Sequence, residues 1–210
     1  MSKPFERKDR FYQKAKKEGY PARSAYKILE LDKRFQIFRP GKTIIDLGCA
    51  PGGWLKVAEE KMNVGVRHAV PLLIGIDLLP LQFTPKKNTH VLQGDFLEKK
   101  NQEKIKELLK SSEGADWVLS DMSPNLSGVK FRDKYASFEL VKKALEFALE
   151  ILKPSGGFVF KIFPGPEWEE LRKDLNTHFQ KIKTVIPEAT RKSSTEIYVI
   201  CNVPLLHPRG

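Results

Sequence analysis

Apolar residues fall into short runs typical of strands and into wider helical stripes, and the two alternate along most of the chain. A stripe capped by Ser24 predicts a helix to about Phe35, which Pro40-Gly41 ends. The β-branched run 43–47 predicts a strand, a glycine-rich turn follows at 48–53, and a helical stripe begins directly after it. Strand, glycine-rich turn and helix in this order are typical of an α/β unit.

The same alternation continues to the C-terminal end. Strands are predicted at residues 72–76, 90–93, 117–120, 158–160, 182–186 and 196–201, helices at 141–152 and 169–179, and loops at 62–71 and 124–133. The run 196–201 is expected to pair antiparallel at or near a sheet edge. The fold class is therefore α/β, with an open and mostly parallel sheet.

Charged residues stand at the ends of four predicted strands. Asp77 ends the run 72–76, Asp95 follows the next run by two residues, and Asp121 and Lys161 end the two runs after that. Ligands of open parallel sheets bind outside the carboxyl ends of the strands. We therefore expect these four side chains to converge on one rim.

Length and charge narrow the class of protein. The chain has 210 residues, enough for one well-cored domain, and its 40% hydrophobic content excludes a disordered protein. Its net charge is +11, and residues 1–34 hold eleven basic against five acidic residues. A basic segment of this kind is either a solvated surface or a site for phosphate backbones, and charge alone does not decide between them.

Cysteine, histidine and apolar patterns exclude several other classes. Cys49 and Cys201 lie far apart without a C-x-x-C motif, which indicates a reducing compartment. The four histidines show no ligand spacing, so no metal is expected. No apolar run is long enough for a membrane span, and no signal peptide is evident. We expect a cytoplasmic protein, or one of the mitochondrial matrix if the source is eukaryotic.

The glycine-rich turn lacks the G-x-G-x-x-G spacing of dinucleotide folds and the G-K-[ST] of phosphate loops. Asp46 precedes it, and a carboxylate there suits a cationic ligand such as S-adenosylmethionine. Asp77 is then placed for the ribose hydroxyls, and Asp95 with Phe96 for the adenine amino group and ring. A lone aspartate is more often a turn residue, but three at successive strand ends favour the cofactor. The turn adds the candidates Gly48, Ala50, Pro51, Gly52, Gly53 and, as ligand wall or core, Trp54.

Several blocks, in order, resemble the FtsJ/RrmJ family of ribose 2′-O-methyltransferases from about Lys8 to Asn202. They are the residues 22–27 (ARSAYK), 46–54 (DLGCAPGGW), 120–125 (SDMSPN), 160–163 (FKIF) and 191–196 (RKSSTE). The resemblance implies a Rossmann-like class I methyltransferase domain with a seven-stranded sheet over residues 23–205. It also implies that S-adenosylmethionine is bound by Gly52, Trp54, Asp77, Asp95 and Asp121.

The family's Lys-Asp-Lys-Glu tetrad falls on Lys27, Asp121, Lys161 and Glu196. The block 187–194 is similar to the branch that modifies a uridine of large-subunit ribosomal RNA. The sequence departs from the family pattern at two places. Cys49 replaces a commoner alanine, and no effect is expected from this change. The 62–71 loop is longer than in the compact bacterial members and is similar to that of mitochondrial members.

A ribose hydroxyl must lose its proton and be held in line with the methyl group that it attacks. We hypothesise that Lys161, positioned by Asp121 and Glu196, accepts that proton. Burial and the Lys27 ammonium would lower the pKa of Lys161, whereas the carboxylates would raise it. If the carboxylates prevail, Lys161 stabilises the developing alkoxide and water takes the proton.

Residues 1–22 are then an RNA-docking extension, and aromatic Phe11, Tyr12 or Tyr20 could stack on a splayed base. Phosphate contacts are expected from Lys8, Arg10, Lys14, Arg23, Arg191 and Lys192. The expected partner is ribosomal RNA, within the large subunit, bound by a monomer. Two alternatives stay open: a 2′-O-methyltransferase of tRNA or an mRNA cap, and a ribosome-assembly factor that binds RNA without catalysis.

Overall fold

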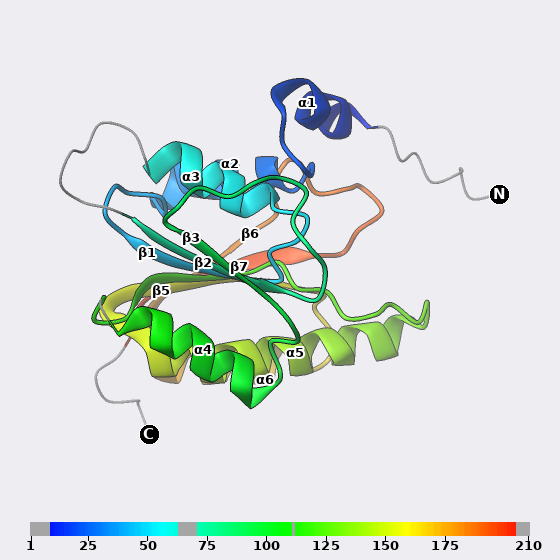
Figure 1. Cartoon of the computed structure of the whole chain (residues 1–210). Coiled ribbons are helices and arrows are strands. Elements are labelled where there is room, and N and C mark those ends of the chain that lie inside the picture. Colours follow the sequence, from blue (N-terminus) through cyan, green and yellow to red (C-terminus); the bar gives the residue numbers. More distant parts are fainter. Residues whose placement is uncertain (1–8, 63–70, 111, 205–210) are drawn as a thin grey trace.

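The computed structural model describes residues 9–62, 71–110 and 112–204, which form one seven-stranded sheet with helices on both faces (Figure 1). The strand order is β3-β2-β1-β4-β5-β7-β6. The strands are β1 Thr43–Leu47, β2 Leu72–Asp77, β3 Thr89–Gln93, β4 Ala115–Ser120, β5 Leu152–Ile162, β6 Phe179–Val185 and β7 Ile197–Pro204. The helices are α1 Arg10–Glu18, α2 Ala25–Phe35, α3 Gly53–Met62, α4 Lys99–Leu109, α5 Lys130–Ile151 and α6 Trp168–His178.

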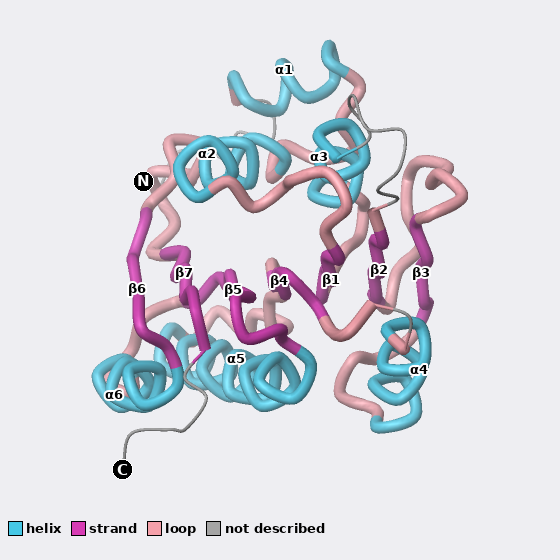
Figure 2. The backbone as a smooth tube through the Cα atoms, turned by 90° about the vertical axis from the view of Figure 1, so that its left-hand side faces the viewer, coloured by secondary structure: helices cyan, strands magenta, loops and turns pink. Residues whose placement is uncertain are grey.

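The helices form two layers, with α1, α2 and α3 over one face of the sheet and α4, α5 and α6 over the other (Figure 2). Each face carries its own hydrophobic core because successive strand residues point to opposite sides. Ile44 and Val159 pack in the core beneath α2 and α3, whereas Ile45, Phe158 and Phe160 pack in the core beneath α4, α5 and α6. The central strands are therefore apolar on both faces, which explains their continuous apolar runs.

The sheet confirms the predicted fold class. β1 pairs in parallel with β2 on one side and with β4 on the other, so the chain reverses direction across the sheet between these strands. β7 pairs antiparallel with both β5 and β6 and lies second from the edge, as expected. A reversal of strand order next to β1 creates a crevice at the carboxyl ends of β1 and β4.

Several element boundaries differ from the predictions. α5 begins at Lys130 and not at 141, so the loop expected at 124–133 is shorter than predicted. Phe131 and Tyr135 in its first turns continue the helical spacing of Phe138, but the polar and turn residues around them favoured a loop. β5 begins at Leu152 and continues through Pro154, where a helix stop was expected. The helices α1 and α4 were not predicted, and the 63–70 part of the loop expected at 62–71 lies outside the described residues.

A buried carboxylate joins three strands at the opposite end of the sheet from the crevice. Asp116 of β4 accepts hydrogen bonds from the backbone N–H of Thr43 at 2.9 Å, from Lys42 Nζ at 2.8 Å and from Lys153 Nζ at 3.0 Å. Burial alone would raise the pKa of Asp116, but these three donors outweigh it and hold the pKa below its usual range. The ionised carboxylate therefore stabilises the junction of β1, β4 and β5.

Asp116→Ala should lower the free energy of unfolding at pH 7 by roughly 2–3 kcal/mol, because it leaves a buried N–H and two ammonium groups unpaired. Since the pKa of Asp116 is lowered on folding, this difference should be complete above about pH 4 and disappear as the pH falls further. Urea unfolding at a series of pH values measures it. Glu103→Ala, which removes an exposed ion pair with Lys106, is the control and should cost under about 1 kcal/mol. Equal losses in the two variants would contradict the assignment.

Candidate active site

The carboxyl ends of β4 and β5 bring Asp121 and Lys161 together, as the topology predicts. Lys161 Nζ lies 3.1 Å from Asp121 Oδ1 and donates a hydrogen bond to the Asp121 carbonyl oxygen at 2.7 Å. The Lys161 side chain is only 8% exposed, so its ammonium group depends on these two oxygen atoms for compensation.

A second ion pair lies beside the first. Lys27 Nζ of α2 is 2.6 Å from Oε1 of Glu196, the residue before β7, and both side chains are nearly buried. Glu196 pairs with Lys27 and not directly with Lys161, so the positioning of Lys161 by Glu196 expected from the sequence would pass through Lys27, Tyr198 and Asp121. Two lysine–carboxylate pairs therefore replace the expected single cluster around Lys161.

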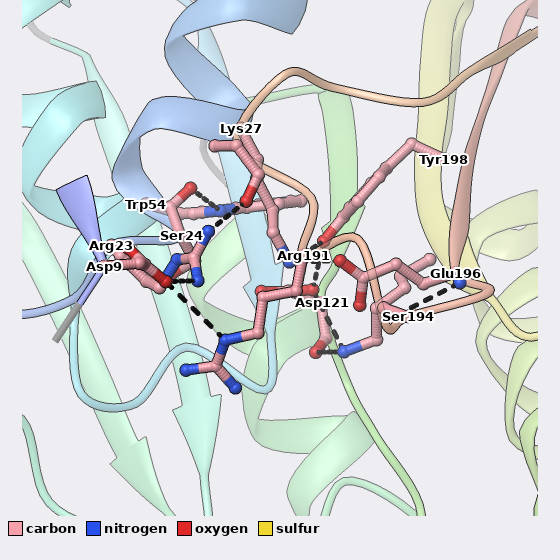
Figure 3. A network of polar contacts seen from close by, with 12 residues as sticks. Asp9, Arg23, Ser24, Lys27, Trp54, Asp121, Arg191, Ser194, Glu196 and Tyr198 are labelled. Atoms are coloured by element: carbon pink, nitrogen blue, oxygen red, sulfur yellow. Dashed lines mark hydrogen bonds and ion pairs between the residues drawn. The ribbon is translucent and has the colours of Figure 1, made fainter. Parts of the chain in front are cut away.

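Tyr198 joins the two pairs, and it was not predicted from the sequence. Its hydroxyl donates to Asp121 Oδ1 at 2.7 Å and accepts from Lys27 Nζ at 3.2 Å (Figure 3). In the antiparallel ladder Tyr198 stands opposite Lys161, and it is two residues from Glu196, so all three lie on the same face. That spacing of two along a predicted strand was the signal that could have found it.

The network sets the protonation states of Tyr198 and Asp121. Burial raises the pKa of Tyr198 well above its usual value, as do the Asp121 and Glu196 carboxylates, so the phenol keeps the proton that it donates. Burial alone would also raise the pKa of Asp121, but the ammonium groups of Lys161 and Lys27 outweigh it and lower that pKa. Asp121 is therefore an anion at neutral pH.

A cavity of about 660 Å³ opens above these residues. Five of its lining residues are basic and lie outside the second ion pair, namely Arg23, Lys130, Lys134, Lys161 and Arg191. Its lining comprises Arg23, Lys27, Ser123, Leu126, Lys130, Asp133, Lys134, Lys161, Phe163, Ala189, Arg191, Ser193, Ser194, Thr195 and Glu196. The cavity therefore has a basic lining that includes Lys27 and Lys161, the lysines of the two ion pairs.

The glycine-rich turn lies next to the network, at the end of β1. Gly48 and Gly52 have φ angles of 79° and 110°, which side-chain-bearing residues rarely adopt. The carboxylate of Asp77, at the end of β2, accepts hydrogen bonds from the N–H groups of Ala50 and Leu79 at 2.8 and 2.9 Å. Asp77 thus holds the turn against the neighbouring strand.

Asp46 is the most unusual group of the site. Its side chain is buried, and neither carboxylate oxygen has a hydrogen-bond partner among the described residues. Burial raises its pKa well above the usual value, and the nearby carboxylates of Asp121 and Asp77 raise it further. An uncompensated buried carboxylate next to two others is a site that a cationic group would neutralise.

Residues 20–203 match the model of the family described as FtsJ-like methyltransferase. The chain belongs to this family. A protein named ribosomal RNA large subunit methyltransferase E from Desulfatibacillum aliphaticivorans is 44% identical over 193 residues, which cover 92% of this chain and 89% of that protein. A protein of the same name from Methanobrevibacter smithii is 41% identical over 192 residues, covering 91% and 88% of the two chains.

Solved structures support the same assignment. A crystal structure from Plasmodium falciparum, titled as a ribosomal RNA methyltransferase, has a TM-score of 0.76 and 29% identity, and covers 90% of this chain and all of that one. Human methyltransferase-like protein 13, solved in complex with SAH, has a TM-score of 0.54 at 12% identity over 89% and 82% of the two chains. The human structure supports the fold alone.

Within this FtsJ-like framework, two candidate cofactor residues lie in the core. Phe96 is 4% exposed and packs edge-on against Phe147 at 5.3 Å, so its ring is not available to stack on an adenine. Trp54 is 3% exposed, and its indole N–H donates to the Ser24 carbonyl at 3.0 Å. Of the two roles considered for Trp54, the structure supports the core. Ser24 itself makes no side-chain cap at α2, contrary to expectation.

Exposed leucines near the candidate adenine and ribose residues were also missed. Leu78 and Leu79 follow Asp77, Leu97 follows Asp95 by two residues, and all three side chains are at least half exposed. The Asp95 carboxylate accepts from the Leu97 N–H at 2.8 Å. Carboxylates flanked by exposed apolar side chains are chemically suited to a ligand with polar and aromatic parts.

The candidate RNA-binding residues differ in how far their side chains are exposed and in whether they are paired with carboxylates. Arg23 is 14% exposed and is paired with Asp9, while it also donates to the Ala189 carbonyl. Arg10 pairs with Glu188 but is 71% exposed. Lys14, Arg191 and Lys192 are exposed, and Lys8 lies outside the described residues.

The aromatic residues of the N-terminal extension need correction. Phe11 and Tyr20 pack on Tyr26 of α2, with ring centroids at 5.6 and 5.9 Å, and the Tyr20 hydroxyl donates to Glu60. Tyr12, at 42% exposed, is the one of the three that remains accessible. Phe11 of α1 and Tyr20, just after the helix, thus fix this segment to the domain.

The described residues lack two further kinds of feature. No described helix is long and apolar enough to cross a membrane. Within the same part of the chain, no cluster of three or more histidine, cysteine or acidic side chains could hold a metal ion.

Tyr198→Phe should reduce methyl transfer about tenfold or more, because it removes hydrogen bonds to a carboxylate and an ammonium group that together position Lys161. Initial rates with radiolabelled methyl donor measure the effect. Tyr26→Phe is the matched control, since it removes a hydroxyl that donates to Glu18 at 2.8 Å, outside the network. The bridging role is refuted if Tyr198→Phe retains the activity of Tyr26→Phe.

Proposed function

We propose that this chain transfers a methyl group from S-adenosylmethionine to the 2′-hydroxyl of a uridine in large-subunit ribosomal RNA. The observation that carries the proposal is the pair of bridged ion pairs, Lys161–Asp121 and Lys27–Glu196, within a cavity with basic walls. The relatives' name supports ribosomal RNA as the substrate. We expect a monomer that acts on the large subunit in the compartment of its ribosomes, the cytoplasm or a mitochondrial matrix.

The residues around the glycine turn fit S-adenosylmethionine, which supplies a methyl group on a positively charged sulfonium. The unpartnered carboxylate of Asp46 suits the cofactor's positive charges, and Gly48 and Gly52 allow the turn its positive φ angles. Asp77 and Asp95 suit the ribose hydroxyls and the adenine amino group, with Leu78, Leu79 and Leu97 as apolar neighbours. Gly53, Ala50 and Pro51 complete the turn.

Lys161 is the residue that we assign to the 2′-hydroxyl. Two of its Nζ positions face the carbonyl and carboxylate oxygens of Asp121, and the side chain borders the cavity, where a ribose can reach the remaining position. As the 2′-oxygen forms its bond to the methyl carbon, the methyl–sulfur bond breaks with its electron pair going to sulfur. In the proposed general-base step the Lys161 ammonium first releases a proton to water, and the resulting amine accepts the proton of the 2′-hydroxyl.

The geometry favours catalysis over a role in RNA binding alone. RNA binding alone does not require two lysines and two carboxylates to be buried. Burying these groups costs free energy unless each charge is compensated. Lys27, Glu196 and Tyr198 compensate the pair that contacts the substrate and restrict the motion of Lys161. Such positioning of a reacting group is a main source of rate enhancement.

Lys161→Ala should lower the rate of methyl transfer to ribosomal RNA by about 10²–10⁴-fold while the fold stays intact, as the loss of a proton-transfer group predicts. Lys183→Ala on the exposed face of β6 is the control and should stay within twofold of the natural chain. Lys161→Arg separates the two roles, since arginine retains the charge but cannot accept the proton. An Arg variant with substantial activity would contradict the general base, and an active Ala variant would contradict the whole assignment.

Asp46→Asn should have opposite effects on stability and on cofactor binding. The pKa of Asp46 is raised by folding, so the natural chain loses stability as the pH rises above about 4, and the variant should avoid that loss. We expect a gain of about 1–2 kcal/mol at pH 8 in the absence of cofactor, with about tenfold weaker binding of S-adenosylmethionine. Thermal unfolding and calorimetry test the two effects, and unchanged cofactor affinity would exclude Asp46 from the site.

A further inference from the structure

Exposed apolar side chains gather on the segment between β4 and the first turns of α5. Isolated exposed hydrophobic residues are ordinary, but a contiguous group in one segment indicates a binding surface. Its members, with their exposed fractions, are Leu126 at 61%, Val129 at 52%, Phe131 at 63% and Tyr135 at 47%. We call these four residues the α5 apolar surface.

The α5 apolar surface borders the catalytic cavity. Leu126 lines the same cavity as Lys161, as do Lys130 and Lys134 of α5. The beginning of α5 and the segment between β6 and β7, which holds Arg191, project at the same end of the sheet (Figure 1). A chain that lies in this cavity can therefore contact Leu126 of the α5 apolar surface, and Phe131 and Tyr135 are the sequence neighbours of Lys130 and Lys134.

Local hydrogen bonds give this surface a defined shape. Asp133 Oδ1 accepts from the backbone N–H and the hydroxyl of Ser127, at 2.7 and 2.8 Å. The Val129 N–H donates to the Ser127 hydroxyl at 3.2 Å. Tyr135 rests on the buried ring of Phe138, at 6.2 Å between centroids. The loop is thus tied to α5, and Tyr135 is supported from below.

The charges around the surface indicate what binds there. Residues 130–135 hold three basic residues, the two aromatic residues Phe131 and Tyr135, and one acidic residue, Asp133, so cationic and aromatic side chains are interleaved. The cores of protein–protein interfaces are depleted in lysine, whereas RNA-binding surfaces combine aromatic rings for unstacked bases with cations for phosphates. The occupant favoured by this chemistry is single-stranded RNA.

We propose that Phe131 and Tyr135 stack on bases adjoining the methylated nucleotide, while Lys130 and Arg132 bind the phosphates between them. The inference rests on the proposed function and deepens it. A ribose that reaches Lys161 must leave the stack of its neighbours, and the exposed rings replace the stacking that those neighbours lose. The surface thereby selects an unpaired segment and presents one nucleotide to the cavity.

The test compares variants of both rings in their binding to a short single-stranded RNA with one 2-aminopurine base. The change Phe131→Ala with Tyr135→Ala should weaken binding about 10–100-fold and restore the fluorescence that stacking quenches in the natural complex. The dependence of affinity on salt should stay the same, whereas Lys130→Ala with Arg132→Ala should reduce the salt slope. Unchanged affinity and quenching in the double ring variant would overturn the proposal.

Two controls make the outcome specific. Phe131→Leu with Tyr135→Leu retains apolar area without aromatic rings, so it should bind RNA as weakly as the alanine variant. Natural affinity in this leucine variant would overturn stacking and show that apolar contact alone suffices for binding RNA. Binding is measured without S-adenosylmethionine, so it does not depend on methyl transfer. A natural chain that binds RNA through these rings but, with the methyl donor, transfers no methyl group would contradict the proposed function alone.

Discussion

The structure depends on the compensation of four nearly buried charges by one another and by a single phenol. Lys161 with Asp121 and Lys27 with Glu196 would each be costly to bury, and the Tyr198 hydroxyl connects them by donating to one pair and accepting from the other. The five residues lie on or directly beside β4, β5, β7 and α2, so no local segment can form the network. It exists only when the β5–β7 register places Lys161 opposite Tyr198.

The network separates two regions with opposite electrostatic character. On the side of the glycine turn, the carboxylates of Asp46, Asp77 and Asp121 lie close enough to raise the pKa of Asp46, which suits a cationic cofactor. On the other side, the cavity is lined by Arg23, Arg191 and further basic residues, which suits a phosphate backbone. A cationic methyl donor and an anionic RNA can thus approach the same lysine from two directions, which we propose is how this FtsJ-like protein works.

Burial and topology could be predicted from the sequence, whereas the direction of individual side chains could not. The apolar run 43–47 is β1 to the residue, and Asp121 and Lys161 meet because parallel strands end on one rim. The ion-pair partners of charged groups were not predictable, since Glu196 pairs with Lys27. The direction of the Phe96 ring was not predictable either, since it points into the core although Asp95 beside it is accessible. The start of α5 was missed because the polar and turn residues at 124–133 favour a loop, although Phe131 and Tyr135 continue the helical stripe of Phe138.

The central claim is that this chain methylates a ribose of large-subunit ribosomal RNA through Lys161. The most direct measurement maps 2′-O-methylation along that RNA from cells that lack the gene and from the same cells supplied with the natural chain or with Lys161→Ala. We predict that one uridine loses its 2′-O-methyl group without the gene, regains it with the natural chain and stays unmethylated with the variant. An unchanged methylation map without the gene would contradict the claim.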